Sequence, residues 1–278
     1  MKPQSMSCAQ SLSRALAATT FAALCLPAFA EDQSYSNSGS PAGNAAPGGA
    51  ATIVLARDLH TLGIREGDAL TVLAAARLAA SVEVVVQEPA ALDPATLTLD
   101  GLGQGFLAGS KLPVPTDPKA PPPLATGAPR PAAKVMLFGE SSKDDGSPPA
   151  SVEAMFGTAS NLAGDDEILL GLIEEAMAEG PGARIGTAAS WLSRLPAGGT
   201  DLWEIPFQGS LDAEIAVIGG GDETLDLAVS DANGTLVCLD IGRSDRFHCH
   251  WTPVRDGHFY VTVRNAGRES TSYQLLTN

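Results

Sequence analysis

Apolar residues follow a helical period in the first part of the chain. Between Ala51 and Leu62, and again after Asp68, they recur every three or four positions, which predicts two helices joined around Gly67. The first helix is expected to end at Gly63, and Asp68 is expected to cap the free amides of the second. This stretch therefore predicts a helical hairpin.

A second helical hairpin is predicted between Val152 and Gly180, with Asp165 as the cap of its second helix. Because each hairpin buries only one side, we expect the two to pack together as a small bundle over residues 50–180. The residues expected to face inward are Leu55, Ala56, Leu59, Leu62, Leu70, Leu73, Ala74, Leu78, Val152, Met155, Phe156, Ala159, Leu162, Ile168, Leu169, Leu172, Ile173, Ala176 and Met177.

The period changes to two after residue 200. Apolar residues alternate with polar ones in short runs, and turn signals such as Gly219–Asp222, Asp231–Gly234 and Arg255–Gly257 separate them. This spacing predicts an antiparallel β-sandwich over residues 200–278, and hence an α+β chain. Val82–Val86 is also β-prone, but one segment does not define a sheet. The alternating residues are Trp203, Ile205, Phe207, Ile215, Val217, Leu225, Leu227, Val229, Phe247, Cys249, Trp251, Phe259, Val261 and Val263.

Three segments show neither the helical period of apolar residues nor the alternation that is typical of a strand. Residues 31–49 are rich in Ser, Gly, Pro, Ala and Asn, so we expect them to be disordered. Residues 108–150 are rich in proline and are expected to form a disordered insertion that loops out of the helical region. A segment that docks on an aromatic groove is the alternative for this insertion. Residues 181–199 are expected to connect the two regions.

Residues 1–30 have the parts of an export signal. Lys2 and Arg14 charge the leading segment, an apolar stretch follows over residues 15–26, and Ala28–Ala30 has the cleavage pattern. The apolar stretch is shorter than the ~20 residues that a membrane span needs. We therefore expect cleavage after residue 30 and a mature chain that is periplasmic or secreted, with no membrane insertion.

The cysteines agree with an exported chain. Two of the four lie in the signal, which leaves Cys238 and Cys249 in the mature chain. An oxidising compartment favours a disulfide between them over two free thiols. Since Cys249 shares a strand face with Phe247 and Trp251, the disulfide is expected to lie against the core. A lipid-modified Cys25 is the weaker alternative, because a leucine precedes it where a lipoprotein signal has a small residue.

The charge narrows the classes of partner. The net charge is −15, and removal of residues 1–30 takes away two positive charges and no negative ones, which moves it to −17. Such a chain lacks the basic surface that nucleic acids require, and anionic lipids would repel it. The acidity would attract cations or basic partners, or it serves only to keep an exported protein soluble.

Carboxylates and an amide around two turns form a candidate calcium site. These residues are Asp222, Asp226, Asp231 and Asn233. Calcium takes six to eight oxygen ligands at about 2.4 Å, and loops at the end of a sandwich can supply them. The alternative is turn chemistry, in which Asp and Asn accept hydrogen bonds from the neighbouring backbone.

A second candidate metal site consists of histidines. His248 and His250 lie two positions apart on one strand and project to the same face, and His258 follows on the next strand. Such a set can hold zinc or copper. The alternative is that exposed strand positions carry histidine without a metal.

No catalytic constellation is found in the sequence. There is no Gly-X-Ser-X-Gly motif for a serine nucleophile and no His-Glu-X-X-His motif for a zinc protease. A disulfide would leave no free thiol in the mature chain. Asp165, Asp166 and Glu167 are clustered, but at a helix start they favour the helix dipole. We assign no catalytic residue and expect a protein that is not an enzyme.

The C-terminal third resembles a known family. Its residues Gly221–Leu227, Asp231–Gly234, Trp251–Pro253, Gly257–Asn265 and Tyr273–Leu275 are similar, in this order, to the bacterial pre-peptidase C-terminal domain. The resemblance covers roughly residues 200–278. It implies a jelly-roll-like β-sandwich that serves as an accessory module for secretion, folding or substrate attachment and does not itself catalyse a reaction.

These observations together predict an exported, non-catalytic binding or accessory protein that acts on an unknown protein partner in the cell envelope or outside the cell. No cofactor is expected, with calcium as the possible exception. One alternative is a calcium- or glycan-binding surface protein, which an exposed Trp191 beside polar residues would favour. The other is a hydrolase with a site between the helical region and the sandwich.

Overall fold

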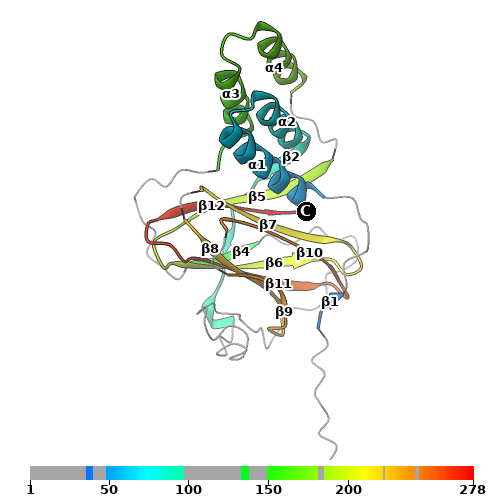
Figure 1. Ribbon diagram of the computed structural model, residues 1–278. Helices are drawn as coiled ribbons and strands as arrows, with labels where there is room; N and C mark the ends of the chain where they lie inside the picture. Colours follow the sequence, from blue (N-terminus) through cyan, green and yellow to red (C-terminus); the bar gives the residue numbers. More distant parts are fainter. Residues whose placement is uncertain are drawn as a thin grey trace, which may run out of the picture. The chain divides into compact units, whose positions relative to one another are not determined.

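The computed structural model describes residues 36–39, 48–96, 133–137, 149–180, 185–221, 223–241 and 244–278. In these residues the chain forms a two-sheet β-sandwich and four α-helices (Figure 1). The predicted α+β class with a β-sandwich is confirmed. The expected export signal, most of the expected disordered tail and most of the proline-rich insertion lie outside the described residues, as does Asp222.

The sandwich consists of two six-stranded sheets. The first has the order β1 (Ser38–Gly39), β10 (Arg246–Pro253), β7 (Ala213–Gly219), β12 (Thr271–Thr277), β5 (Gly186–Leu195) and β2 (Val82–Val86). The second has the order β3 (Ala90–Ala91), β4 (Lys134–Leu137), β6 (Thr200–Phe207), β11 (Gly257–Asn265), β8 (Leu225–Asp231) and β9 (Leu236–Asp240). A short 3-10 helix, η1 (Pro94–Thr96), follows β3. The described strand pairs are antiparallel except β2–β5 and β3–β4, which are parallel.

The core between the sheets is built from the alternating residues that the sequence singled out. Phe207, Trp251 and Phe259 form an aromatic cluster with ring centroids 4.9–5.8 Å apart. Aromatic pairs in tilted and edge-on geometry stabilise a core by more than the burial of their apolar area alone provides. The buried residues of this core also include Trp203, Ile205, Ile215, Val217, Leu225, Leu227, Val229, Phe247, Cys249, Val261, Val263 and Tyr273.

The helices are α1 (Gly49–Glu66), α2 (Ala69–Ala80), α3 (Val152–Ala163) and α4 (Glu167–Glu179). Asp68 caps α2 as predicted, since its side chain accepts from the Leu70 backbone N–H. Two expected positions were wrong. First, α1 continues through Gly63 and ends at Gly67, which adopts the left-handed conformation with φ 66°. Second, Asp166 and not Asp165 caps α4.

The inward face of the first hairpin also differs from the prediction. Leu55, Leu62, Leu70 and Ala74 are exposed, whereas Ala56 and Leu73 are buried as predicted, together with Ile53, Val72 and further alanines. The reason is close approach: a Cβ at Gly63 of α1 would lie 2.6 Å from the Val72 side chain of α2, so only a small residue fits there. In the second hairpin the prediction holds for Met155, Phe156, Ala159, Ile173 and Ala176, which are buried, but Leu162, Ile168, Leu172 and Met177 are exposed.

Helices α1 and α2 pack on the outer face of the first sheet, and α3 and α4 pack on α2 and on each other. Their buried side chains share one cluster with Val82 of β2, Ala188 of β5 and Ile218 of β7. The sandwich therefore does not begin at residue 200. Residues 181–199, expected as a connector, contain strand β5, whose Ala188 faces the helices while Trp191 faces the opposite sheet. Because β5 has buried residues on both faces, it shows no regular apolar–polar alternation that the sequence analysis could detect.

Candidate interaction surface

Helix α4 carries an apolar arc wider than the part of it that is buried. At 100° per residue, the arc runs from Ile168 through Leu172, Ala176 and Ile173 to Met177, about 180° around the helix. Only the middle of the arc packs on neighbouring helices, through Ile173 and Ala176. Ile168 is 81% exposed, Leu172 46% and Met177 50%. The two flanks of the arc thus remain open to solvent on opposite sides of the helix, with Met177 on one side and Ile168 and Leu172 on the other, and we call Ile168 and Leu172 the α4 face.

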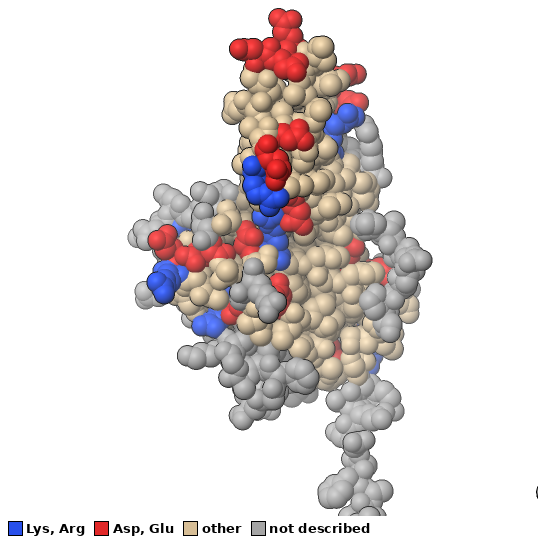
Figure 2. Space-filling view, viewed as in Figure 1, with Lys and Arg blue, Asp and Glu red and all other residues tan. Residues whose placement is uncertain are grey.

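Carboxylates surround the α4 face. Residues 149–180 contain seven acidic residues and no Lys or Arg: Glu153, Asp165, Asp166, Glu167, Glu174, Glu175 and Glu179. Figure 2 shows acidic side chains gathered at the end of the helical hairpins where α4 lies. The ion pair that reaches this cluster in the described residues is Arg77–Glu179, at 3.3 Å. An apolar surface with an acidic rim attracts a partner of the opposite pattern, apolar with a basic rim.

The helical hairpins are fixed to the sandwich by a carboxylate. Glu214 of β7 is 4% exposed, and its two oxygens accept from the backbone N–H groups of Gly48 and Ala51 at 2.8 and 3.4 Å. The start of α1 has no capping side chain of its own, so Glu214 supplies the acceptors that an N-cap residue would supply. A Cβ at Gly48 would lie 2.4 Å from the Glu214 carboxylate, so the contact requires glycine.

Basic side chains gather at the same seam, between α1 and β10. Arg246 pairs with Asp58 at 2.6 Å. Burial and the charge of Arg246 lower the pKa of Arg57 to about 10, and burial and both arginines lower the pKa of His60. The Nε and Nη1 atoms of Arg57 are buried without a hydrogen-bond partner. The Arg246–Asp58 ion pair joins β10 to α1, so these groups help to position α1 on the sheet.

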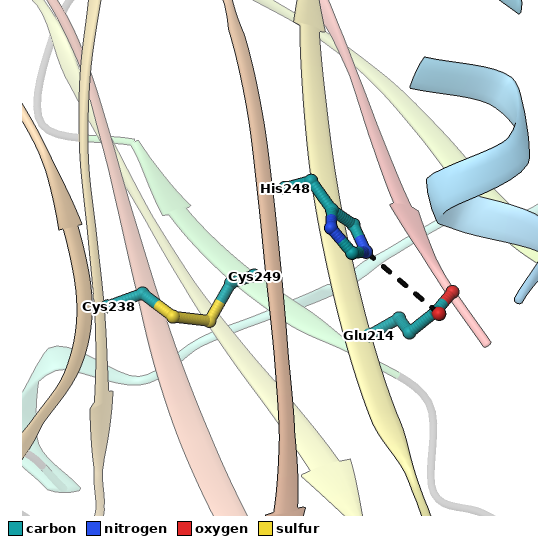
Figure 3. Close-up of a disulfide and its surroundings, with 4 residues drawn as sticks. All are labelled: Glu214, Cys238, His248 and Cys249. Carbon is teal, nitrogen blue, oxygen red and sulfur yellow. Dashed lines mark ion pairs between the residues drawn. A yellow bond between two sulfur atoms is a disulfide. The ribbon is translucent and has the colours of Figure 1, made fainter. Parts of the chain in front are cut away.

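The predicted histidine set is not brought together. His248 and His250 lie on β10 in the first sheet, and His258 lies on β11 in the second. Each has an acidic neighbour: His248 faces Glu214 at 4.0 Å, His250 faces Asp212 at 3.7 Å, and His258 faces Glu204 at 3.9 Å. Figure 3 shows the first of these pairs. Burial lowers the pKa of His248 although the Glu214 charge opposes the shift.

The described members of the predicted calcium set are also apart. Asp226 and Asp231 lie near the two ends of β8, five positions apart, which is about 17 Å along a strand. Asp226 pairs with Arg264 at 3.6 Å. Asp231 accepts from the backbone N–H groups of Asn233 and Thr235, which is turn chemistry, and from that of Asn37. The fourth member, Asp222, lies outside the described residues.

Searches for other chemistry in the described residues give two findings. Among the residues that the structure describes, no group of three or more His, Cys, Asp or Glu side chains could hold a metal ion. None of the helices in the same residues is long and apolar enough to cross a membrane.

The expected disulfide is present. Cys238 of β9 and Cys249 of β10 are bonded, with Cα atoms 6.2 Å apart (Figure 3). Cys249 is 1% exposed and belongs to the core between the sheets, with Cys238 packed against it. Because β9 lies in the second sheet and β10 in the first, the disulfide links the two sheets covalently. The predicted place of the disulfide against the core is confirmed.

A buried carboxylate lies between the sheets. Asp201 accepts hydrogen bonds from the Tyr273 hydroxyl at 2.6 Å and the Ser193 hydroxyl at 2.7 Å, and Trp203 Nε1 donates to the Tyr273 oxygen at 2.7 Å. Burial raises the pKa of Asp201 to about 6, and it raises the pKa of Tyr273 well above its ordinary value. A perturbed carboxylate often marks an active site, but Asp201 is 1% exposed and its partners come from the core, so the network links strands.

Sequence reasoning missed the two features that define the surface. The Glu214 cap joins residues 166 positions apart, and no local pattern signals it. The α4 face was predicted as buried, because the period of a helix shows where its apolar side is but not how much of it a neighbour covers. The one available signal was the excess width of the apolar arc. Trp191, a candidate for a glycan platform if exposed, is 3% exposed in the core.

Comparisons with known proteins give little similarity. No protein-family model matches the chain, and no curated protein matches it. One similar solved structure is the pre-peptidase C-terminal domain of collagenase from Bacillus anthracis. It is 12% identical over 32% of this chain and 87% of that chain, with a TM-score of 0.29. A TM-score this low does not demonstrate a shared fold.

Proposed function

We propose that this protein is an exported, non-catalytic binding protein that acts through protein–protein interaction in the cell envelope or outside the cell. The α4 face carries the proposal: two large apolar side chains, Ile168 and Leu172, stay exposed on one side of a helix in a segment, residues 149–180, that contains seven acidic residues and no Lys or Arg. Exposed apolar patches of this kind are typical of interaction sites. The partner is expected to present an apolar surface bordered by Lys or Arg.

The export part of the proposal rests on the signal pattern at residues 1–30 and on the Cys238–Cys249 disulfide. Disulfides persist in oxidising compartments and are rare in the cytosol. N-terminal sequencing of protein recovered from the periplasm or the medium should begin at Glu31. Recovery of the uncleaved chain from the cytosol would contradict export.

The interaction part is tested by affinity capture with a matched pair of variants. The mature chain, residues 31–278 with its disulfide intact, would be immobilised and exposed to the envelope and secreted extract of the producing organism. We expect one stoichiometric protein partner whose retention falls at high salt and is lost with the double variant Ile168→Ser/Leu172→Ser. The control is Leu192→Ser, which changes an exposed leucine on β5, outside the helical hairpins (57% exposed).

Three outcomes would contradict the proposal. A partner retained equally by the double variant would remove the α4 face from the interaction. Bound glycan in place of protein would favour the surface-binding alternative. Turnover of a peptide, ester or glycoside that a single side-chain substitution abolishes would show an enzyme.

A further inference from the structure

Strand β2 has one paired and one open edge. It is the last strand of the first sheet and pairs with β5 alone among the described strands. The Gln87 N–H donates to the Ser190 carbonyl of β5 at 2.8 Å, which shows which backbone groups face β5. In a strand these groups alternate in direction, so those of Val85 and Gln87 face β5 and those of Val84 and Val86 face the open edge. A row of unsatisfied backbone donors and acceptors is a template for another strand.

The open edge lacks several of the features that usually protect such a strand. Val86 is 68% exposed and Val85 is 44% exposed. Within Val82–Val86 there is no proline, no lysine and no bulge, and its register with β5 is continuous. Glu83 and Glu88, both exposed, lie on either side of the valines.

A cavity of about 350 Å³ opens beside this edge, between the two sheets. Its lining comes mainly from the first sheet on one side and from β6 of the second sheet on the other. The lining residues are Val85, Gln87, Ala133, Thr187, Ala188, Ala189, Trp191, Ile205, Pro206 and Asn278. None of these side chains is ionisable. The Trp191 indole Nε1 is buried in this region without a hydrogen-bond partner. The cavity therefore suits one uncharged side chain.

We propose that the β2 edge binds an extended segment of a partner polypeptide as an additional strand of the first sheet. The backbone of the segment would pair with the open groups of Val84 and Val86, and one apolar side chain would enter the cavity beside Val85. Lys or Arg at the ends of the segment would lie near Glu83 and Glu88. The inference builds on the proposed function as a binding protein, but it uses a surface distinct from the α4 face.

Charge decides between a foreign segment and a second copy of this chain. Two copies of the mature chain paired through β2 would bring together two net charges of −17, since −15 for the full chain loses two positive charges with residues 1–30, and each copy has Glu83 and Glu88 at the edge. Their mutual repulsion disfavours that assembly, while a segment carrying Lys or Arg would be attracted.

The test begins with a random nine-residue peptide library displayed on phage and selected on the folded mature chain. We expect enrichment of peptides with apolar residues at alternate positions and Lys or Arg near the ends. Labelled synthetic copies should bind in fluorescence anisotropy, and Val86→Pro should weaken binding at least tenfold because it removes a backbone N–H at the open edge. The matched control Val86→Thr keeps that N–H and should bind like the wild type.

A second measurement needs no protein variant. Methylation of alternate backbone nitrogens in the selected peptide removes its strand-pairing donors and should abolish binding, whereas methylation of the other set should not. Lack of enrichment, indifference to Val86→Pro, or equal tolerance of both methylated peptides would overturn the proposal. So would a dimer in sedimentation that Val86→Pro dissociates, which would assign the edge to a second copy.

The outcomes separate this proposal from the proposed function. Ile168→Ser/Leu172→Ser should leave peptide binding unchanged, and Val86→Pro should leave capture of the α4 partner unchanged. If no partner is captured through the α4 face but peptides bind at the β2 edge, only the proposed function is wrong. If a partner is captured but no peptide binds, only the proposal for the β2 edge is wrong.

Discussion

The two sheets meet over large aromatic side chains, whereas alanine is the commonest buried residue in the cluster that joins the helices to one another and to the first sheet. Between the sheets lie Trp203, Trp251 and Phe259, each at most 2% exposed. Under the helices the buried set includes Ala50, Ala56, Ala76, Ala79, Ala159 and Ala176. Large side chains in the helices are often outside, as on the α4 face. The sandwich therefore uses its apolar residues for its own stability, and the helical hairpins keep several of theirs exposed.

This contrast separates stability from binding. Side chains that fill a core cannot contact a partner, and exposed apolar side chains add little to the free energy of folding. The sandwich supplies a rigid base, and the hairpins project a surface from it. Substitutions in the two regions should accordingly change different measurements.

The largest expected effect is on the sandwich core. Phe259→Ala removes a ring that is fully buried against Phe207 and Trp251, so it should lower the free energy of unfolding by about 3–5 kcal/mol. Ile168→Ala on α4 should change it by less than about 0.5 kcal/mol. Urea denaturation followed by circular dichroism measures both. Similar losses for the two variants would contradict the division of roles.

The second effect is a pH dependence located in the sandwich. The pKa of Asp201 rises from 3.8 to about 6 on folding, so between these values the folded state holds a proton that the unfolded state has lost. The contribution of Asp201 to the free energy of unfolding therefore falls as the pH rises from about 4 to about 6, by roughly 3 kcal/mol in total.

Asp201→Asn should remove this contribution. The difference in unfolding free energy between wild type and variant, measured from pH 4 to pH 7, isolates Asp201 from the other carboxylates of the acidic chain. A difference that stays constant over this range would show that Asp201 titrates normally in the folded protein.

The smallest effect lies at the seam between the two regions. Glu214→Ala leaves the first-turn amides of α1 without their acceptor and should cost about 1–2 kcal/mol. Asp58→Ala removes only a half-exposed ion pair with Arg246 and should cost less, within about 1 kcal/mol. Hydrogen exchange should show faster exchange at the start of α1 in the first variant alone. Uniform acceleration throughout the sandwich would mean that the two regions unfold as one.

The sequence predicted those features that depend on local patterns. Period two located β6, β7, β8, β10 and β11, and the shared face of Phe247, Cys249 and Trp251 placed the disulfide against the core. The Asp68 cap was also predictable, because an N-cap is read from a few adjacent residues.

Features that depend on distant partners could not be predicted. Strand β5 has buried residues on both faces and so lacks alternation, and the β-prone segment of β2 joins the sheet because β5 lies beside it. The exposed leucines of α1 and α2 follow from the close approach at Gly63, where small residues and not large ones define the contact. The cavity beside Trp191 requires both sheets and has no signature in either segment alone.

The order of the strands has a consequence for processing of the chain. β2 precedes α3 and α4 in the sequence and β5 follows them, yet the two strands are hydrogen-bonded neighbours, and β4 likewise joins β6. A protease that cut between α4 and β5 would therefore release nothing at once, since the two fragments would remain interleaved in the same two sheets. The C-terminal part of this protein is not a detachable module, and its fragments should behave as complementing halves that reassemble when mixed.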